Sequence, residues 1–182
     1  MSLKSYFIIC TIVILQSCEK DNHTRTYHLP KSEVPTKIQP VNSPKSGIRW
    51  DIPKTWVTSS GSSMRLASFE VPYMGGTGDL SVIQLARVGG GLKPNINRWR
   101  RQLNLEPQSL HEIEKDLIEK KGELGKYKMI RIINFQNNSA FLVAIIPFEN
   151  QTLFVKLSAD PSGIQEAESD FLFFCSSIHF VH

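Results

Sequence analysis

Two strongly apolar segments separated by three polar residues dominate the C-terminal half of the chain. Residues 139–148 have the sequence SAFLVAIIPF and residues 152–159 have the sequence TLFVKLSA, with Glu149, Asn150 and Gln151 between them. Short apolar runs bounded by polar residues are typical of strands, and so short a connection predicts a hairpin. Apolar residues occupy both alternating positions of each run, so this part of the sheet must be covered on both faces.

The remaining strands are predicted by alternation of apolar and polar residues. The segments 64–73 and 79–88 alternate and are separated by Met74–Gly78, which we expect to be a hairpin loop. A strand is predicted over 126–135, with 117–123 as its expected partner. Short strands are predicted at 48–50, before a turn that returns the chain to Trp56, and at 178–180.

Two helices are predicted by their capping residues. Ser109 with Glu112 forms the pattern of a capping box and predicts a short helix. Ser162 with Gln165 has the same spacing and predicts the start of a long helix. The apolar stripe of this long helix comprises Ile164, Ala167, Phe171 and Phe174. With the strands, these helices predict a single α+β domain in which an antiparallel β-sheet is packed between helices.

A third helix begins after a run of three glycines. Ile96, Trp99 and Leu103 have the spacing of one buried helix face. Arg98 and Arg101 are expected on the opposite face, and Arg100 at its edge, with its head in reach of a carboxylate.

The glycine run and the basic residues that follow it leave three interpretations open. The segment VGGGLKPNINRWRRQL lacks the spacing of a P-loop and of a dinucleotide fingerprint. Pro94 also removes an amide donor that a phosphate cradle would use. A loop that enters an amphipathic helix explains every residue. A basic contact surface made of Lys93, Arg98 and Arg101, for an acidic partner or a lipid headgroup, is the first alternative, and a phosphate-binding catalytic loop is the second.

The N-terminus has the features of a bacterial lipoprotein signal. Lys4 precedes an apolar run from Tyr6 to Leu15, which is about half the roughly 20 residues needed to span a bilayer. The sequence LQSC that ends at Cys18 resembles a lipobox, although Gln16 is an uncommon residue at its tolerant position. Cys18 is therefore the predicted lipid-attachment residue, and two or three acyl chains hold a protein on a membrane stably.

Three regions follow from these features. Residues 1–17 are predicted to be the lipoprotein signal peptide, 18–47 the lipidated cysteine with a disordered tether, and 48–182 the globular domain. The tether is rich in proline, serine and charge and shows no apolar periodicity. The predicted location is the bacterial cell envelope, with the domain anchored to a membrane through Cys18 and facing the periplasm.

Several segments of the domain resemble known proteins. IRWDIPKTWV, SSMRLASFEVP, NINRWRRQL, FVKLSADP and DFLFFCSSIHF resemble, in order, segments of an uncharacterised group of secreted bacterial proteins. The first and last also resemble the wider PsbP-like fold, in which helices enclose an antiparallel sheet as an α/β/α sandwich. That fold serves photosystem assembly and nuclear-transport binding, so the resemblance implies binding or assembly work rather than catalysis.

No catalytic constellation was found in the sequence. The chain has no G-x-S-x-G or H-E-x-x-H motif, and only Cys175 lies outside the N-terminal segment, where a small buried residue is expected. We therefore expect a non-catalytic envelope binding or assembly module without cofactor or metal. A net charge of +4, without a concentrated basic stripe, argues against a nucleic-acid partner. The alternatives are a small-ligand carrier or sensor, with Trp50, Trp56 and Trp99 lining its pocket, and, more remotely, an enzyme of unrecognised type.

Overall fold

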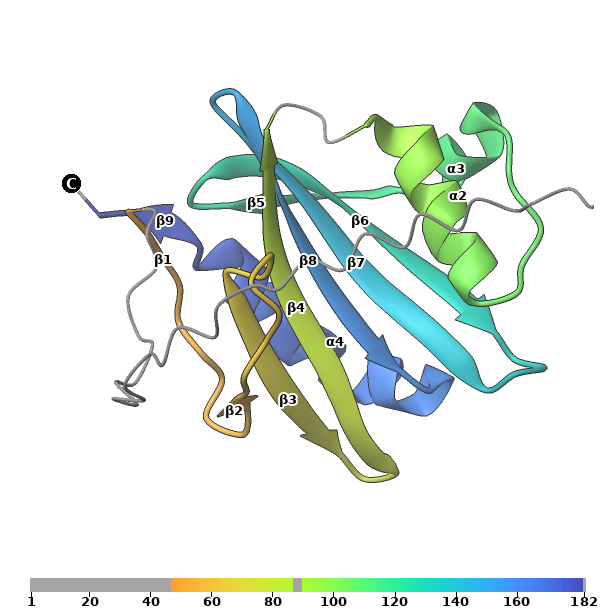
Figure 1. Cartoon of the computed structure of the whole chain (residues 1–182), viewed down its shortest axis with the longest axis horizontal. Helices are drawn as coiled ribbons and strands as arrows, with labels where there is room; N and C mark the ends of the chain where they lie inside the picture. The colour runs from red at the N-terminus through yellow and green to blue at the C-terminus, as the bar shows by residue number, and fades with distance from the viewer. Residues whose placement is uncertain (1–46, 87–89, 182) are drawn as a thin grey trace, which may run out of the picture. The chain divides into compact units, whose positions relative to one another are not determined.

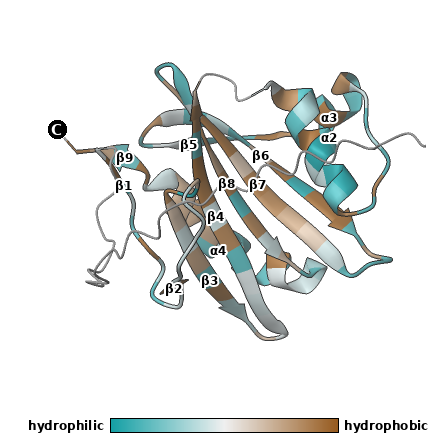
Figure 2. Cartoon of the chain, in the orientation of Figure 1, coloured by the Kyte–Doolittle hydropathy of each residue, from teal (hydrophilic) through white to brown (hydrophobic). Residues whose placement is uncertain are grey.

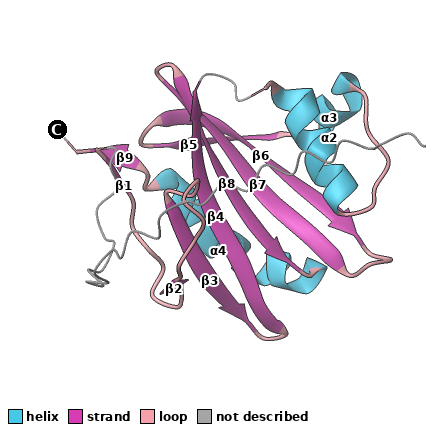
Figure 3. Cartoon of the chain, viewed as in Figure 1, coloured by secondary structure: helices cyan, strands magenta, loops and turns pink. Residues whose placement is uncertain are grey.

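The structure is a computed structural model that describes residues 47–86 and 90–181. These residues form a seven-stranded sheet and a separate pair of two-residue strands, with three helices (Figures 1 and 3). The order in the large sheet is β2-β3-β4-β8-β7-β6-β5, and every neighbouring pair is antiparallel. The strands of this sheet are β2 (Val57–Thr58), β3 (Ala67–Tyr73), β4 (Gly76–Ala86), β5 (Ile118–Gly122), β6 (Gly125–Asn134), β7 (Ser139–Phe148) and β8 (Gln151–Ala159).

The helices lie on both faces of the sheet. α2 (Leu92–Gln102) and α3 (Leu110–Asp116) cover one face, and α4 (Pro161–Ser176) covers the other (Figure 1). The predicted fold class, a single α+β domain with an antiparallel sheet between helices, is confirmed. Among the residues that the structure describes, no helix is both long enough and apolar enough to cross a membrane.

The predicted central hairpin is confirmed, together with its burial on both faces. β7 and β8 pair over their whole length, from Ala140 opposite Ala159 to Phe148 opposite Gln151. Alternate residues of β7 enter two different cores: Leu142 packs with the α4 side and Val143 with the α2 side. Figure 2 shows apolar residues concentrated on these central strands. A strand that lies between two helix layers therefore needs apolar side chains at both of its alternating positions.

The hairpin of β3 and β4 is confirmed with a shorter loop than predicted. Pairing continues to Tyr73 opposite Gly76, so only Met74 and Gly75 form the turn. The longer loop was predicted because three of the five residues Met74–Gly78 are glycines. Gly78 instead lies within β4, opposite Val71. A Cβ there would lie 2.8 Å from Leu157 Cδ1, so glycine permits a close approach that a larger residue would not. β3 also begins three residues later than predicted, at Ala67.

The capping box of α3 is confirmed, whereas the one predicted for α4 is wrong. Ser109 accepts a hydrogen bond from the Glu112 amide, and the Glu112 carboxylate accepts one from the Ser109 amide. In α4 the N-cap is Asp160, whose Oδ1 accepts from the Gly163 amide at 2.6 Å. Pro161 occupies the first helical position, so the cap falls on the residue before it. Ser162 instead donates its hydroxyl to Asp160 at 2.8 Å.

The predicted burial of α4 and the two predicted terminal strands are both seen in the structure. The predicted stripe of Ile164, Ala167, Phe171 and Phe174 is buried against the sheet. β1 (Ile48–Arg49) pairs with β9 (His179–Phe180), so the two predicted terminal strands meet, each one residue shorter than expected. The predicted signal peptide, Cys18 and the tether up to residue 46 lie outside the described residues.

Candidate functional site

Helix α2 is held by the apolar face that its spacing predicts. Ile96, Trp99 and Leu103 are buried, and Trp99 packs edge-on against Phe154 of β8 with ring centroids 5.8 Å apart. Gly91 precedes the helix with a φ of 88°, a left-handed conformation that glycine adopts without strain. The interpretation of this stretch as a loop that enters an amphipathic helix agrees with this geometry.

Two buried asparagines of α2 were not predicted. Asn97 Nδ2 donates to the Gln108 carbonyl at 2.9 Å, and its Oδ1 accepts from the Gln108 amide at 2.8 Å. This pair of bonds ties α2 to the segment that leads into α3. Asn95 Nδ2 donates to the Gly91 carbonyl at 2.8 Å. Sequence reasoning placed only apolar residues on the buried face, and two asparagines two positions apart give no periodic signal of burial.

The predicted surface residues Lys93, Arg98 and Arg101 are all exposed on α2. At 100° per residue they span about 140° of the helix circumference, and we call these three residues the basic face. Arg98 is held in place, because its Nη2 donates to Asn95 Oδ1 at 2.8 Å. α2 contains no acidic residue, so nothing within the helix neutralises this face.

Arg100 differs from the prediction in its hydrogen-bond partner. Its hydrogen bond goes to a backbone group, because Nε donates to the carbonyl of Glu106 at 2.7 Å. The carboxylate in reach of its charge is that of Glu112, whose pKa is lowered mainly by the bonds to Ser109 and further by Arg100. The half-buried guanidinium thus closes the C-terminal end of α2 instead of extending the basic face.

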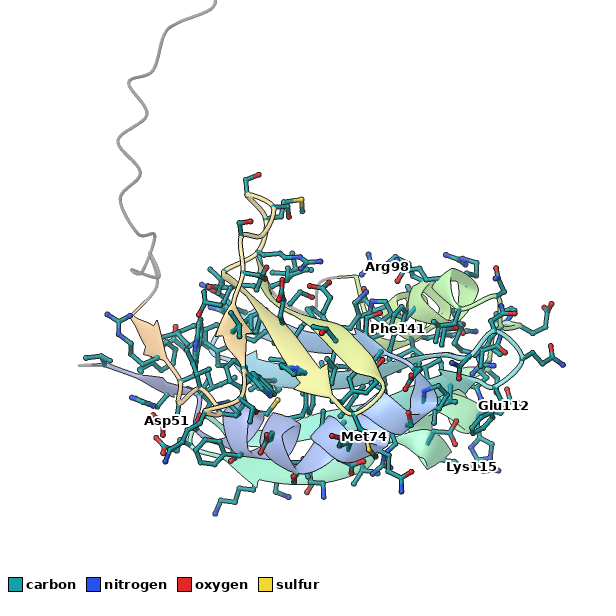
Figure 4. The ribbon with its side chains drawn as sticks, turned by 90° about the horizontal axis from the view of Figure 1, so that it is seen from below. Asp51, Met74, Arg98, Glu112, Lys115 and Phe141 are labelled. Atoms are coloured by element: carbon teal, nitrogen blue, oxygen red, sulfur yellow. The ribbon has the colours of Figure 1, made fainter. Side chains whose placement is uncertain are left out.

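Lys156 of β8 adds a cation that the sequence did not place near α2. Its Nζ lies 4.3 Å from the centre of the Phe141 ring and 3.5 Å from Gln102 Oε1 of α2. Burial lowers the pKa of Lys156, and the positive charges of Arg65 and Arg98 lower it further, while the negative charge of Asp79 partly opposes them. Across 47–86 and 90–181, no carboxylate oxygen forms an ion pair with Lys156. Figure 4 shows Arg98 on the same side of the sheet as Phe141.

The acidic group whose charge acts on Lys156, Asp79, already forms an ion pair with Arg65. Asp79 of β4 receives both terminal nitrogens of Arg65, at 2.9 and 3.0 Å, and this bidentate pair is a strong form of ion pair. Arg65 Nη1 also lies 3.3 Å from the Ser68 hydroxyl. The side of the sheet next to α2 therefore combines one satisfied ion pair with the two cations Arg98 and Lys156, for which no ion pair is seen in the described ranges.

The hypothesis that three tryptophans line one ligand pocket is wrong. Trp56 is buried, and Trp50 half-buried, in the core on the α4 side, where their rings lie 5.2 and 5.8 Å from the Phe174 ring. Trp99 belongs to the core on the opposite face. The sheet separates them, and each contributes to packing.

Among the described residues, His111, Cys175 and His179 belong to three different elements, α3, α4 and β9. His111 is exposed on α3, and His179 Nδ1 lies 2.8 Å from the Ser177 carbonyl. Cys175 is buried as predicted, and burial raises the pKa of its thiol. Within the described part of the chain, no group of three or more histidine, cysteine or acidic residues is arranged to hold a metal ion.

Comparisons with known proteins give similarity of fold at low identity. No protein-family model matches the chain, and no curated protein matches it. A crystal structure from Bacteroides thetaiotaomicron VPI-5482 has a TM-score of 0.48 and 11% identity over 77% of this chain, which spans only 48% of that one.

This chain covers most of the length of two further solved structures. Cyanobacterial PsbP (CyanoP) from Synechocystis sp. PCC 6803 has a TM-score of 0.45 and 15% identity, over 74% of this chain and 87% of that one. LpqN of Mycobacterium tuberculosis, described as involved in cell envelope biogenesis, has a TM-score of 0.41 and 12% identity, over 74% and 83%. No family assignment follows from these similarities.

Proposed function

We propose that this chain is a non-catalytic binding module of the bacterial cell envelope, and that the basic face of α2 contacts an acidic protein there. The observation that carries the proposal is the cationic surface formed by α2 and β8. Arg98 is oriented by Asn95, and Lys156 is half-buried beside it without an ion pair among the described residues. For a partly desolvated cation such as Lys156, pairing with a carboxylate of the partner contributes more binding free energy than it does for a fully exposed cation.

The envelope location rests on the N-terminal sequence. A lipid on Cys18, followed by the predicted tether of about 30 residues, would keep the domain near the membrane; a random-coil chain of that length has an end-to-end distance on the order of 30 Å. An anchored domain meets membrane and periplasmic proteins at high effective concentration, so a modest contact surface is sufficient for function.

Reversing the charge of the basic face tests the contact. In cells, Arg98→Glu combined with Arg101→Glu is expected to reduce crosslinking to the acidic partner about 10-fold, which corresponds to about 1.4 kcal/mol. The remaining binding should lose its dependence on salt, because exposed charges act through a screened field. The adducts are quantified by mass spectrometry after crosslinking at two salt concentrations.

A matched control separates the basic face from net charge. Lys54→Glu combined with Lys121→Glu changes the charge equally at exposed lysines for which the structure shows no ion pair within the described residues. This variant should crosslink like the wild type. Equal losses in both variants, or no loss in either, would remove the basic face from the proposal.

The anchor has its own test. Cys18→Ser is expected to abolish lipidation and to block processing by the lipoprotein signal peptidase, because the thiol is the acceptor of the lipid. Mass spectrometry of detergent-extracted membranes compares the mature N-termini of the wild type and the variant. A wild-type protein that is processed but carries no lipid would overturn the anchor and leave the contact surface untouched.

A further inference from the structure

A pocket of about 240 Å³ lies on the α2 side of the sheet, and no tryptophan is among its lining residues. Its apolar wall comes from the first residue of α2 and from the paired strands β7 and β8: Leu92, Ile145, Pro147 and Phe154. Its charged lining residues are Lys126 and Lys128 of β6 and Glu119 of β5. The surface inside the pocket is mostly apolar.

The pocket exists because α2 begins part-way along the strands that it covers. Lys128, Ile145 and Phe154 lie opposite one another on β6, β7 and β8. Trp99 packs on Phe154 from the next turns of α2, whereas Ile145 is only partly covered. The pocket is therefore a continuation of the α2-side core that no side chain of the described residues fills.

The charges around the pocket favour an anion. Lys126 is paired with Glu119, with 2.7 Å between Nζ and Oε1. Lys128 lies opposite the same Glu119 in the sheet and, after Lys126, also lowers the pKa of that carboxyl group. Two lysines therefore share one carboxylate at the pocket, which leaves an excess of positive charge. Gly91 caps α2 without a side-chain hydrogen bond, and the first turn contains no acidic residue. The positive end of the α2 dipole thus adds to the charge of Lys128 at the same pocket.

We propose that this pocket binds the chain of a medium-length carboxylate, with the apolar tail against Ile145 and Phe154 and the carboxylate beside Lys128. The volume equals that of about eight water molecules at about 30 Å³ each. It is below the roughly 300–1,000 Å³ of pockets for drug-sized ligands, so one short acyl chain fits and a whole phospholipid does not. This site is separate from the basic face and does not depend on the function proposed for it.

Titration of the full chain with decanoate, decanol and acetate tests the site. The protein carries Cys18→Ser so that no attached acyl chain competes, and binding is measured calorimetrically. Decanoate should bind saturably with one site, and acetate should not bind at all. Octanoate, titrated in the same way, is two methylenes shorter and should bind about 16-fold more weakly, because each buried methylene contributes about fourfold. Absence of saturable decanoate binding would overturn the proposal.

Two variants with matched controls locate the ligand. Ile145→Trp fills the pocket and should weaken decanoate binding more than 10-fold, whereas Val57→Trp, on an exposed residue of the edge strand β2, should leave it unchanged.

Lys128→Gln should weaken the binding of decanoate several-fold and leave the binding of decanol unchanged. Lys121→Gln, outside the pocket, should alter neither. Because Lys128 is exposed, its variant keeps the test decisive even if Ile145→Trp does not fold. Unchanged decanoate binding in Lys128→Gln would show that the carboxylate does not lie there, and the assignment would fail.

Discussion

Trp99→Ala is expected to lower the free energy of unfolding by about 3–5 kcal/mol, the usual cost of truncating a buried aromatic residue. Trp99 is 5% exposed and is the largest side chain that α2 places against the sheet, where its ring packs on Phe154. Removing it leaves a cavity between α2 and β8 that a helix tied to Gln108 through Asn97 cannot easily close. A thermal melt should show a decrease in melting temperature of about 10 °C or more.

A second variant of the same helix shows whether the faces of α2 are assigned correctly. Arg101→Glu changes an exposed residue and should alter the free energy of unfolding by less than about 0.5 kcal/mol. Arg98→Glu also removes the bond to Asn95, so a cost of about 1 kcal/mol is expected there. If Trp99→Ala melted like the wild type while Arg101→Glu was destabilised, the buried and exposed faces would have to be exchanged.

Elements with a strong apolar period could be predicted from the sequence. The β7–β8 hairpin, the buried stripe of α4 and the inner face of α2 follow from side chains that have only one favourable environment. The capping box at Ser109 was also predictable, because its partner Glu112 is local in sequence. The cap of α4 was assigned wrongly because Ser162 and Gln165 have the same spacing, while the decisive feature is that Asp160 precedes a proline.

The parts of the candidate site that depend on register could not be predicted. Lys156 lies in an apolar strand, and its position beside Arg98 is set by the pairing of β8 with β7 and by the packing of α2 across them. Asn97 is buried because a distant backbone segment supplies its two hydrogen bonds. Such positions follow from tertiary structure, since a polar side chain can be buried wherever a partner is brought to it.

The second large effect on stability is expected in the core on the α4 side of the sheet. Phe174→Ala is expected to reduce the free energy of unfolding by about 3–5 kcal/mol and the melting temperature by about 10 °C or more. Phe174 is fully buried, and its ring lies 5.2 Å from Trp56, 5.8 Å from Trp50 and 5.5 Å from Phe69. Phe174 therefore packs α4 against the segment that contains Trp50 and Trp56 and against Phe69 of β3.

The adjacent residue supplies the control for this effect. Phe173 is also on α4 but is 50% exposed, so Phe173→Ala removes a similar side chain without leaving a cavity and should cost well under about 1 kcal/mol. Thermal melts followed by tryptophan fluorescence compare the two variants, because Trp50 and Trp56 both contact the Phe174 ring. In the folded state, the emission of Phe174→Ala should shift to longer wavelength as water reaches these two rings, and that of Phe173→Ala should not. Equal melting temperatures for the two variants would show that α4 does not pack on the sheet through Phe174. The contacts of Phe174 with Trp50 and Trp56 could then not be what holds that segment against α4.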